Sequence, residues 1–216
     1  MSTQTRRPLA EAEKAADDII SILFESCERI EVAGSIRRKQ AYVGDIEIVA
    51  IPKTVMRQRA GQLTFFQPAK SVKINAVWER ITDSRQFQPV KRPTNKHELI
   101  ADDENWINKG VAGKAKYFKV LDHESRFMVD LFLTTPEAWG AIFTIRTGCA
   151  GFSKALVTYW TRISRGGHMR DGLFHDAKGN VVPTPEEEDV FRIMELPFIS
   201  PEERVDGRVL HRGGGK

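Results

Sequence analysis

The sequence predicts an α+β fold built on a mixed sheet, and three patterns carry this prediction. Residues 8–27 space apolar side chains as an amphipathic helix does, and residues 43–51 alternate apolar and acidic side chains as a half-exposed strand does. Residues 116–133 read as two strands around a polar turn. Beyond residue 135, short helices and short strands alternate, which indicates a second, smaller α+β subdomain.

The composition excludes several classes of protein. With 216 residues, of which 41% are hydrophobic and 29% charged, the chain can build a packed core. No apolar run approaches the roughly 18 residues of a membrane-spanning helix, and the basic N-terminus lacks an apolar region. We therefore expect a cytoplasmic protein, inside a bacterial, viral or host cell, with no membrane partner. Cys27 and Cys149 are expected to be free thiols, because two cysteines form no disulfide framework or zinc site.

The chain is expected to divide near residue 135. Residues 1–135 would form the first subdomain, with a basic insertion at about 52–113, and residues 136–207 the second. Residues 208–216, which end in three glycines and a lysine, are expected to be a flexible tail.

A basic segment falls inside the first subdomain. Residues 51–100 hold ten Lys and Arg against three acidic residues, interleaved with aromatic side chains, in a chain of net charge +4. This composition favours a surface that binds phosphates and stacks on bases. A solvated segment whose aromatic side chains belong to the core is the alternative.

The second subdomain carries its own boundary signals. We expect helices over residues 136–145 and 152–164, and a hairpin over residues 172–182. Thr184 and Glu187 have the spacing of a capping box with proline between them, which predicts a last helix from that point.

Three carboxylates form the candidate chemical centre. Asp45 and Glu47 alternate with apolar residues, so a period of two places both on one face of a strand. Asp130 stands between apolar residues of another strand, and the three acids converge if the two strands are neighbours. Carboxylates on rigid strands suit Mg²⁺ or Mn²⁺, and two such ions would activate a hydroxyl and neutralise a departing pyrophosphate. Acids that simply face water are the alternative.

A candidate phosphate cradle precedes these acids. Gly34 follows a short predicted strand and would let the backbone approach a phosphate closely, while Ser35 and Arg38 add a hydroxyl and a forked cation. Such a cradle belongs beside a metal site that handles a triphosphate.

These motifs resemble those of a known family. Gly34-Ser35-Ile36-Arg37-Arg38, followed by the run from Val43 to Val49, is similar to the signature of the nucleotidyltransferase superfamily, and specifically to the palm of X-family DNA polymerases, the DNA polymerase beta relatives. Thr147-Gly148 with Phe152 downstream, and the segments 172–174, 185–191 and 196–204, resemble the nucleotide-selecting subdomain of that family. The resemblance covers residues 9–50 and 116–205.

The resemblance implies a role for each motif. Asp45, Glu47 and Asp130 would be the catalytic residues and would bind two Mg²⁺ ions, which Mn²⁺ can replace. The implied nucleotide-binding residues are Gly34, Ser35, Arg38, Gly44, Thr147 and Gly148. Residues 1–135 would be a nucleotidyltransferase-type palm.

The activity that the resemblance implies is that of a minimal X-family DNA polymerase without the lyase domain. It would be a monomer that adds a nucleotide from a dNTP to a primer 3′-hydroxyl, on primer–template or gapped DNA, in short-gap repair. The sequence departs from the family pattern at Glu47, which is usually Asp, at Ile145-Arg146, where aromatic residues are usual, and at Ser153, which is often Asn. A template-independent or RNA-directed nucleotidyltransferase and a catalytically weak DNA-binding pseudo-polymerase are the two alternatives.

Overall fold

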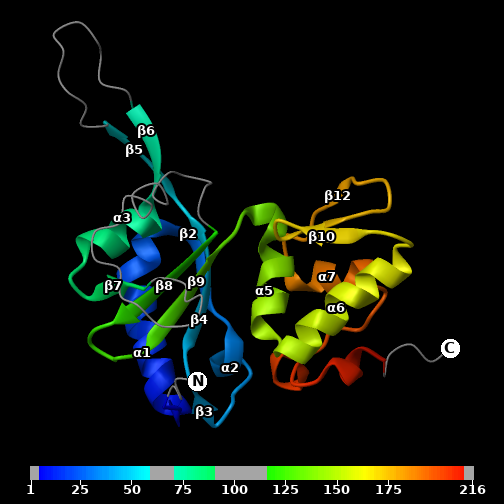
Figure 1. The fold of residues 1–216 in the computed structure, drawn as a ribbon, viewed down its shortest axis with the longest axis horizontal. Helices are drawn as coiled ribbons and strands as arrows, with labels where there is room; N and C mark the ends of the chain where they lie inside the picture. The colour runs from blue at the N-terminus through cyan, green and yellow to red at the C-terminus, as the bar shows by residue number, and fades with distance from the viewer. Residues whose placement is uncertain (1–4, 59–70, 91–115, 212–216) are drawn as a thin grey trace, which may run out of the picture.

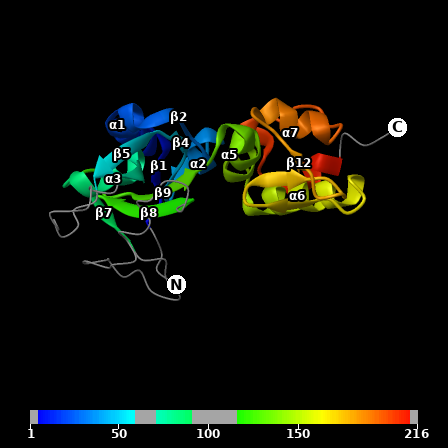
Figure 2. The same cartoon turned by 90° about the horizontal axis from the view of Figure 1, so that it is seen from above.

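The computed structural model describes residues 5–58, 71–90 and 116–211. Two lobes lie side by side, and helix α5 (Trp139–Thr147) lies at their junction (Figures 1 and 2). The first lobe holds a mixed sheet with helices against it, and the second holds helices and a small sheet. The predicted α+β class is confirmed.

The first lobe is organised by a five-stranded sheet. Its strands are β2 (Cys27–Val32), β4 (Ile46–Pro52), β9 (Met128–Leu133), β8 (Tyr117–Asp122) and β7 (Phe87–Pro89), in that spatial order. β4 and β9 are parallel, and every other neighbouring pair is antiparallel. The hairpin predicted over residues 116–133 is therefore present as β8 and β9, and β9 also pairs with β4.

Helices cover one face of this sheet. α1 (Leu9–Leu23), continued by a 3₁₀ turn (Phe24–Ser26), and α3 (Ala76–Asp83) share one hydrophobic core with the strands. The strand residues in that core include Ile46, Ile48, Val129 and Leu131, all fully buried. Because side chains alternate along a strand, the residues between them point to the opposite face. That opposite face carries Glu47 and Asp130.

The opposite face of the sheet is partly covered by α5. Val49, Ile51 and Phe132 pack against Trp139 and Phe143 of that helix. The same alternation that turns the carboxylates away from the main core at one end of β4 and β9 thus supplies a small second core at the other end.

Shorter elements complete the first lobe. β1 (Arg7–Pro8) pairs with β3 (Tyr42–Val43), and α2 (Gly34–Arg37) is a single turn after β2. β5 (Thr54–Gln58) and β6 (Ser71–Asn75) form a two-stranded ribbon that projects from the lobe (Figure 1). The remainder of the predicted basic insertion, at 59–70 and 91–113, lies outside the described residues.

One predicted strand is interrupted. The expectation of a single strand over residues 43–51 was wrong, because Gly44 and Asp45 form a bend between β3 and β4. Asp45 therefore stands immediately before β4 and not inside it.

The second lobe contains α6 (Ala150–Ile163), α7 (Glu187–Ile193) and a small antiparallel sheet. The strands of that sheet are β10 (His168–Arg170), β11 (Leu173–His175) and β12 (Val181–Val182), and the 3₁₀ turns are Pro136–Ala138, Pro201–Glu203 and Gly207–His211. Its core includes Phe152, Leu156, Phe174 and Phe191. None of the helices in the described parts of the chain is long and apolar enough to cross a membrane.

Two sequence expectations for this lobe are corrected. Residues 208–211 of the predicted flexible tail belong to the 3₁₀ turn Gly207–His211, because Leu210 is buried in the core of the lobe. The residues after 211 lie outside the described part of the chain.

The capping box of α7 is formed by Glu186 and Asp189, and not by Thr184 and Glu187. Glu187 cannot serve as a cap because its carboxylate is held in the interior by two arginines. Arg204, which is completely buried, donates to one carboxylate oxygen of Glu187 at 2.5 Å. Arg37 of the first lobe donates to the other oxygen at 2.6 Å. One buried carboxylate therefore ties the two lobes together.

Burial alone would raise the pKa of Glu187, but the hydrogen bonds and positive charges of Arg37 and Arg204 outweigh it and lower the pKa. A carboxyl group whose pKa is lower in the folded state stabilises the fold above its unfolded pKa. That contribution disappears as the pH falls through the folded pKa.

We predict that Glu187→Gln lowers the free energy of unfolding at pH 7 by about 3 kcal/mol, because it leaves Arg204 buried without a counter-charge. The difference from the parent protein should shrink as the pH falls below about 4.3, the ordinary glutamate pKa. Urea denaturation at several pH values measures both effects. Glu13→Gln is the control, since the Glu13–Lys39 pair is exposed and is expected to contribute less than about 1 kcal/mol. Equal losses in the two variants would contradict the prediction.

Candidate functional site

The predicted carboxylates meet on the open face of the sheet. The parallel pairing of β4 with β9 makes Glu47 and Asp130 direct register partners, and Asp45 precedes Glu47 by two residues. The pKa of Glu47 is raised to about 7 by burial first and then by the negative charges of Asp45 and Asp130. Burial and the charge of Asp130 also raise the pKa of Asp45. The three acids are thus close enough to repel one another.

Gly34 fixes the position of one of these acids. Its φ of +61° lies in the left-handed region, and a side chain there would collide with the carboxylate of Glu47. The amide of Ala33 donates to the carbonyl of Glu47 at 2.8 Å, which holds the two segments together. A glycine is therefore required here by its neighbour as well as by the backbone.

A cavity of about 440 Å³ lies between these acids and the segment after β2. Five of the predicted residues line it, namely Ser35, Arg38, Gly44, Asp45 and Glu47. Arg6, Gln40 and Tyr42 also line it, and sequence reasoning did not identify them. Arg6 and Tyr42 enter because β1 pairs with β3, a pairing of two residues that no local periodicity signals.

The side chains that line this cavity suit a bound anion, held by arginine, next to a bound metal cation, held by the acids. The Nε of Arg38 is buried and has no hydrogen-bond partner among the described residues. The positive charge of Arg38 at the wall of the cavity favours an anionic ligand. The acids opposite supply hard oxygen atoms of the kind that Mg²⁺ prefers.

Thr147 and Gly148, which the resemblance assigns to the nucleotide, lie at the junction of the lobes. Thr147 is completely buried at the junction of the lobes, where its hydroxyl accepts from Arg37 at 2.8 Å and its carbonyl accepts from Arg38 at 2.5 Å. Gly148 packs closely on the ring of Phe152. The two residues do not line the cavity, but Arg38 connects them to it.

Asp130 has two partners that the sequence did not reveal. The Nζ of Lys119 lies 3.1 Å and 3.3 Å from its two carboxylate oxygens, and the hydroxyl of Tyr117 donates to Oδ1. Within residues 5–58, 71–90 and 116–211, no three His, Cys, Asp or Glu side chains are arranged as ligands of a metal ion. The acids are gathered, but the oxygens of Asp130 are directed at Lys119 and Tyr117.

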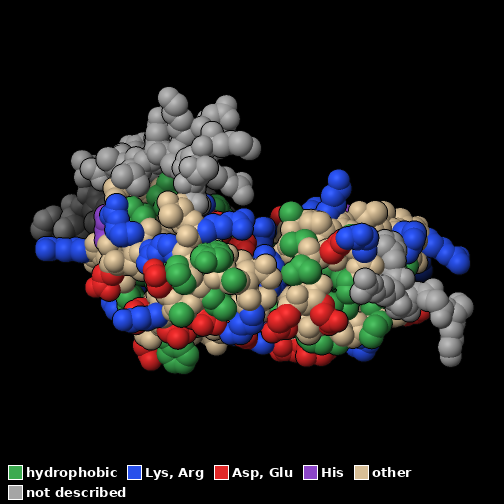
Figure 3. Space-filling view, turned by 90° about the horizontal axis from the view of Figure 1, so that it is seen from below, with side chains coloured by type: hydrophobic (Ala, Val, Ile, Leu, Met, Phe, Trp, Pro, Cys, Tyr) green, Lys and Arg blue, Asp and Glu red, His purple; other side chains and the backbone are tan. Residues whose placement is uncertain are grey.

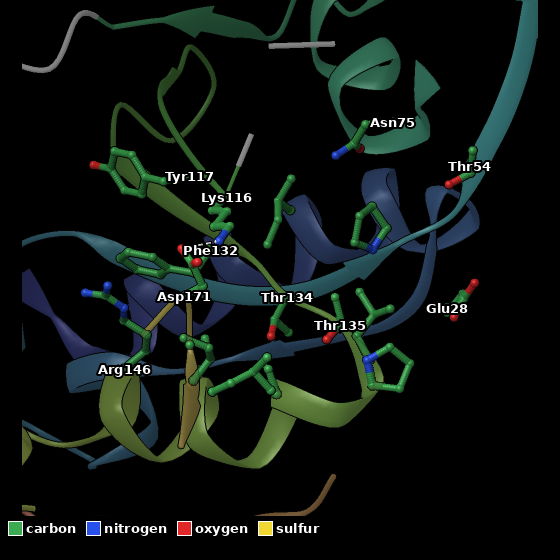
Figure 4. Close-up of a pocket in the computed structure, with 18 residues that line it drawn as sticks. Glu28, Thr54, Asn75, Lys116, Tyr117, Phe132, Thr134, Thr135, Arg146 and Asp171 are labelled. Atoms are coloured by element: carbon green, nitrogen blue, oxygen red, sulfur yellow. Dashed lines mark hydrogen bonds and ion pairs between the residues drawn. The ribbon is translucent and has the colours of Figure 1, made fainter. Parts of the chain in front are cut away.

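A larger cavity of about 670 Å³ lies farther along the same face (Figure 4). Ile51 and Phe132 line it, and both alternate onto the same face as the carboxylates. Arg146 stacks on the ring of Phe132 at 3.8 Å, and Lys116 pairs with Asp171 of the second lobe at 2.6 Å (Figure 4). None of Asp45, Glu47 and Asp130 lines this cavity, so we assign the candidate chemistry to the smaller one.

The surface around the junction is charged. In the view of Figure 3, Lys and Arg side chains lie at the middle of the face, where the two lobes meet, with acidic side chains beside them.

Residues 147–205 match a family model, the DNA polymerase beta thumb. This segment runs from Thr147, which is bound to Arg37 and Arg38, to the residue after Arg204. The match thus covers most of the second lobe and supports a relationship to DNA polymerase beta. It does not reach the sheet that carries the carboxylates. No curated protein matches the sequence.

We predict that Gly34→Ala destabilises the protein more than a positive φ alone explains. Gly179 has a φ of +84° with nothing near its missing side chain, and Gly44 has an open site without a positive φ. Gly179→Ala should therefore cost about 1 kcal/mol and Gly44→Ala close to nothing. Gly34→Ala should cost at least about 1 kcal/mol more than Gly179→Ala, because it also displaces Glu47. Urea denaturation of the three variants decides, and equal costs at positions 34 and 179 would contradict the packing of Glu47 on Gly34.

Proposed function

We propose that the protein is a nucleotidyltransferase of the DNA polymerase type, which joins the α-phosphate of a dNTP to a primer 3′-hydroxyl and releases pyrophosphate. The observation that carries this proposal is the meeting of Glu47 on β4, Asp130 on β9 and Asp45 just before β4, beside a cavity lined by Arg38. The thumb match in the adjoining lobe supports it. Filling of short gaps during DNA repair is the role that we propose for it.

The phosphate end of the substrate would lie in the smaller cavity. Ser35 would donate a hydroxyl hydrogen bond, and the guanidinium of Arg38 would supply positive charge to the phosphate oxygens. Gly44 lets the backbone approach, since the space beside it is open. These groups position the triphosphate, and positioning supplies much of the catalysis in phosphoryl transfer.

Asp45, Glu47 and Asp130 would hold two Mg²⁺ ions, or Mn²⁺ in their place. Bound there, the ions would lower the pKa of the primer hydroxyl and neutralise charge on the phosphates. The mutual repulsion of the acids fits this role, since crowded carboxylates gain most from a cation. Glu47 is one methylene longer than the usual Asp and keeps a carboxylate in register with Asp130 across β4 and β9.

We predict primer extension on a one-nucleotide gap with dNTP and Mg²⁺, and an at least ~100-fold loss of rate in Asp130→Asn. Asp83→Asn, on the helix-covered side of the sheet, is the matched control and should retain the parent rate. Parallel reactions on an open template and on a bare single strand distinguish templated from untemplated addition. Reactions with NTPs in place of dNTPs show which sugar the protein accepts. Untemplated addition would move the assignment to a terminal-type transferase, one of the alternatives suggested by Ile145-Arg146.

One observation favours a second candidate, a DNA-binding pseudo-polymerase. Lys119 and Tyr117 engage both oxygens of Asp130, and the described residues show no ready ligand set for a metal. DNA binding without incorporation of any nucleotide, in Mg²⁺ or Mn²⁺, would establish this candidate instead.

DNA would be held in part by the basic segment. Lys53, Lys73 and Arg85 are exposed on the described part of it. We predict that replacing all three with Gln weakens DNA binding and lowers the slope of log K against log salt by about 0.9 per phosphate contact removed. Fluorescence anisotropy with a gapped duplex at several salt concentrations measures this. Lys178→Gln, in an exposed turn of the second lobe, is the control, and an unchanged slope in the triple variant would exclude the segment from DNA binding.

A further inference from the structure

Strand β8 brings a positive charge into the carboxylate cluster. Its side chains alternate, so that Phe118 and Val120 enter the core while Tyr117 and Lys119 face the carboxylates. Lys119 is the direct register partner of Asp130 across the β8–β9 ladder. The ladder itself, and not a flexible loop, therefore places the ammonium group at the carboxylate.

The ion pair is largely shielded from water. The side chains of Lys119 and Asp130 are each 12% exposed, and the ammonium group reaches both carboxylate oxygens. Charges interact more strongly in such surroundings than at an open surface. Lys119 also acts favourably on the negative charge of Asp45, so its influence extends to a second acid of the cluster.

A cation at this place and a divalent metal ion need the same oxygens. A carboxylate oxygen has two lone pairs, and Tyr117 and Lys119 together use those of Oδ1, so a metal ion can coordinate Oδ1 only if one of the two donors withdraws. At Oδ2 the positive charge of Lys119 repels a second cation. The four-carbon side chain of lysine is flexible, which allows the ammonium group to withdraw without movement of the strand.

We propose that Lys119 is a built-in counter-cation that holds Asp130 until divalent metal displaces it, and that it thereby sets the metal affinity of the site. This inference rests on the proposed function, because it takes the three acids as metal ligands. Lys119 is a positioning residue in this scheme: it acts on Asp130 and not on the substrate. Tyr117 keeps its hydrogen bond to Asp130 and orients the carboxylate throughout.

The first test measures Mn²⁺ binding to the protein alone, without DNA or nucleotide, by the electron paramagnetic resonance signal of free Mn²⁺. Lys119→Met removes the charge and should tighten binding about tenfold. Lys119→Arg keeps the charge and should bind close to the parent affinity. Asp130→Asn should bind more weakly than the parent protein.

The outcomes separate the two proposals. Weaker binding in Asp130→Asn with unchanged or weaker binding in Lys119→Met would overturn the counter-cation and leave the metal site intact. Parent affinity in Asp130→Asn would overturn the proposed metal site and the counter-cation with it.

A second measurement uses the unaltered protein, because Lys119→Met leaves crowded acids uncompensated and can impair folding. Acetylation by a water-soluble active ester, followed by mass spectrometry, reports the accessibility of each lysine amine. Mg²⁺ should raise the labelling rate of Lys119 severalfold and leave that of Lys178, in an exposed turn, unchanged. Labelling of Lys119 that does not respond to Mg²⁺ would overturn the proposal.

Discussion

The repulsion between three acids on one face of the sheet is the constraint on which the rest of the structure depends. Parallel pairing of β4 and β9 forces Glu47 and Asp130 side by side, and Asp45 stands two residues away. Buried like charges persist only where positive groups offset them. Lys119 does so from β8, while Arg38, at the end of α2, and Arg146 of α5 act on Glu47. The charges of the sheet are therefore balanced partly by groups that belong to the junction of the lobes.

The junction repeats this arrangement around a second buried acid. Glu187 accepts from Arg204 in its own lobe and from Arg37 in the other. Arg37 also binds the hydroxyl of Thr147, and its neighbour Arg38 binds the carbonyl of the same residue. Arg37, the last residue of α2, thus holds the second lobe, and Arg38, which caps α2, lines the candidate phosphate cavity. The residues that line the cavity and those that hold the second lobe are therefore adjacent in the chain.

The spacing of apolar residues along the sequence predicted the features that depend on neighbouring residues alone. The period of two in residues 46–51 and 128–133 predicted which side chains face away from the core, and the α+β class followed from it. The ion pair of Lys119 with Asp130 could not be predicted in the same way, since it depends on the register between two strands. The cap of α7 was mispredicted for a related reason: Glu187 has the right spacing for a cap, but two arginines distant in sequence claim its carboxylate. Residue spacing identifies candidate groups, and tertiary pairing decides which partner each one takes.

Arginine, and not lysine, suits the junction for a geometric reason. Arg29 stacks on Trp139 at 4.1 Å and binds Glu186, and Arg37 stacks on Phe143 at 3.8 Å and binds Glu187. A planar guanidinium can stack through its face while donating through its edge, which a compact ammonium cannot do. Beside Asp130 the demand is the opposite. A compact, flexible ammonium suits the exchange that we propose, in which the cation beside Asp130 is held and then released. Arginines thus make the stacked contacts of the junction, where Lys116 and Asp171 add one lysine pair, while the cation beside Asp130 is a lysine, as the exchange that we propose requires.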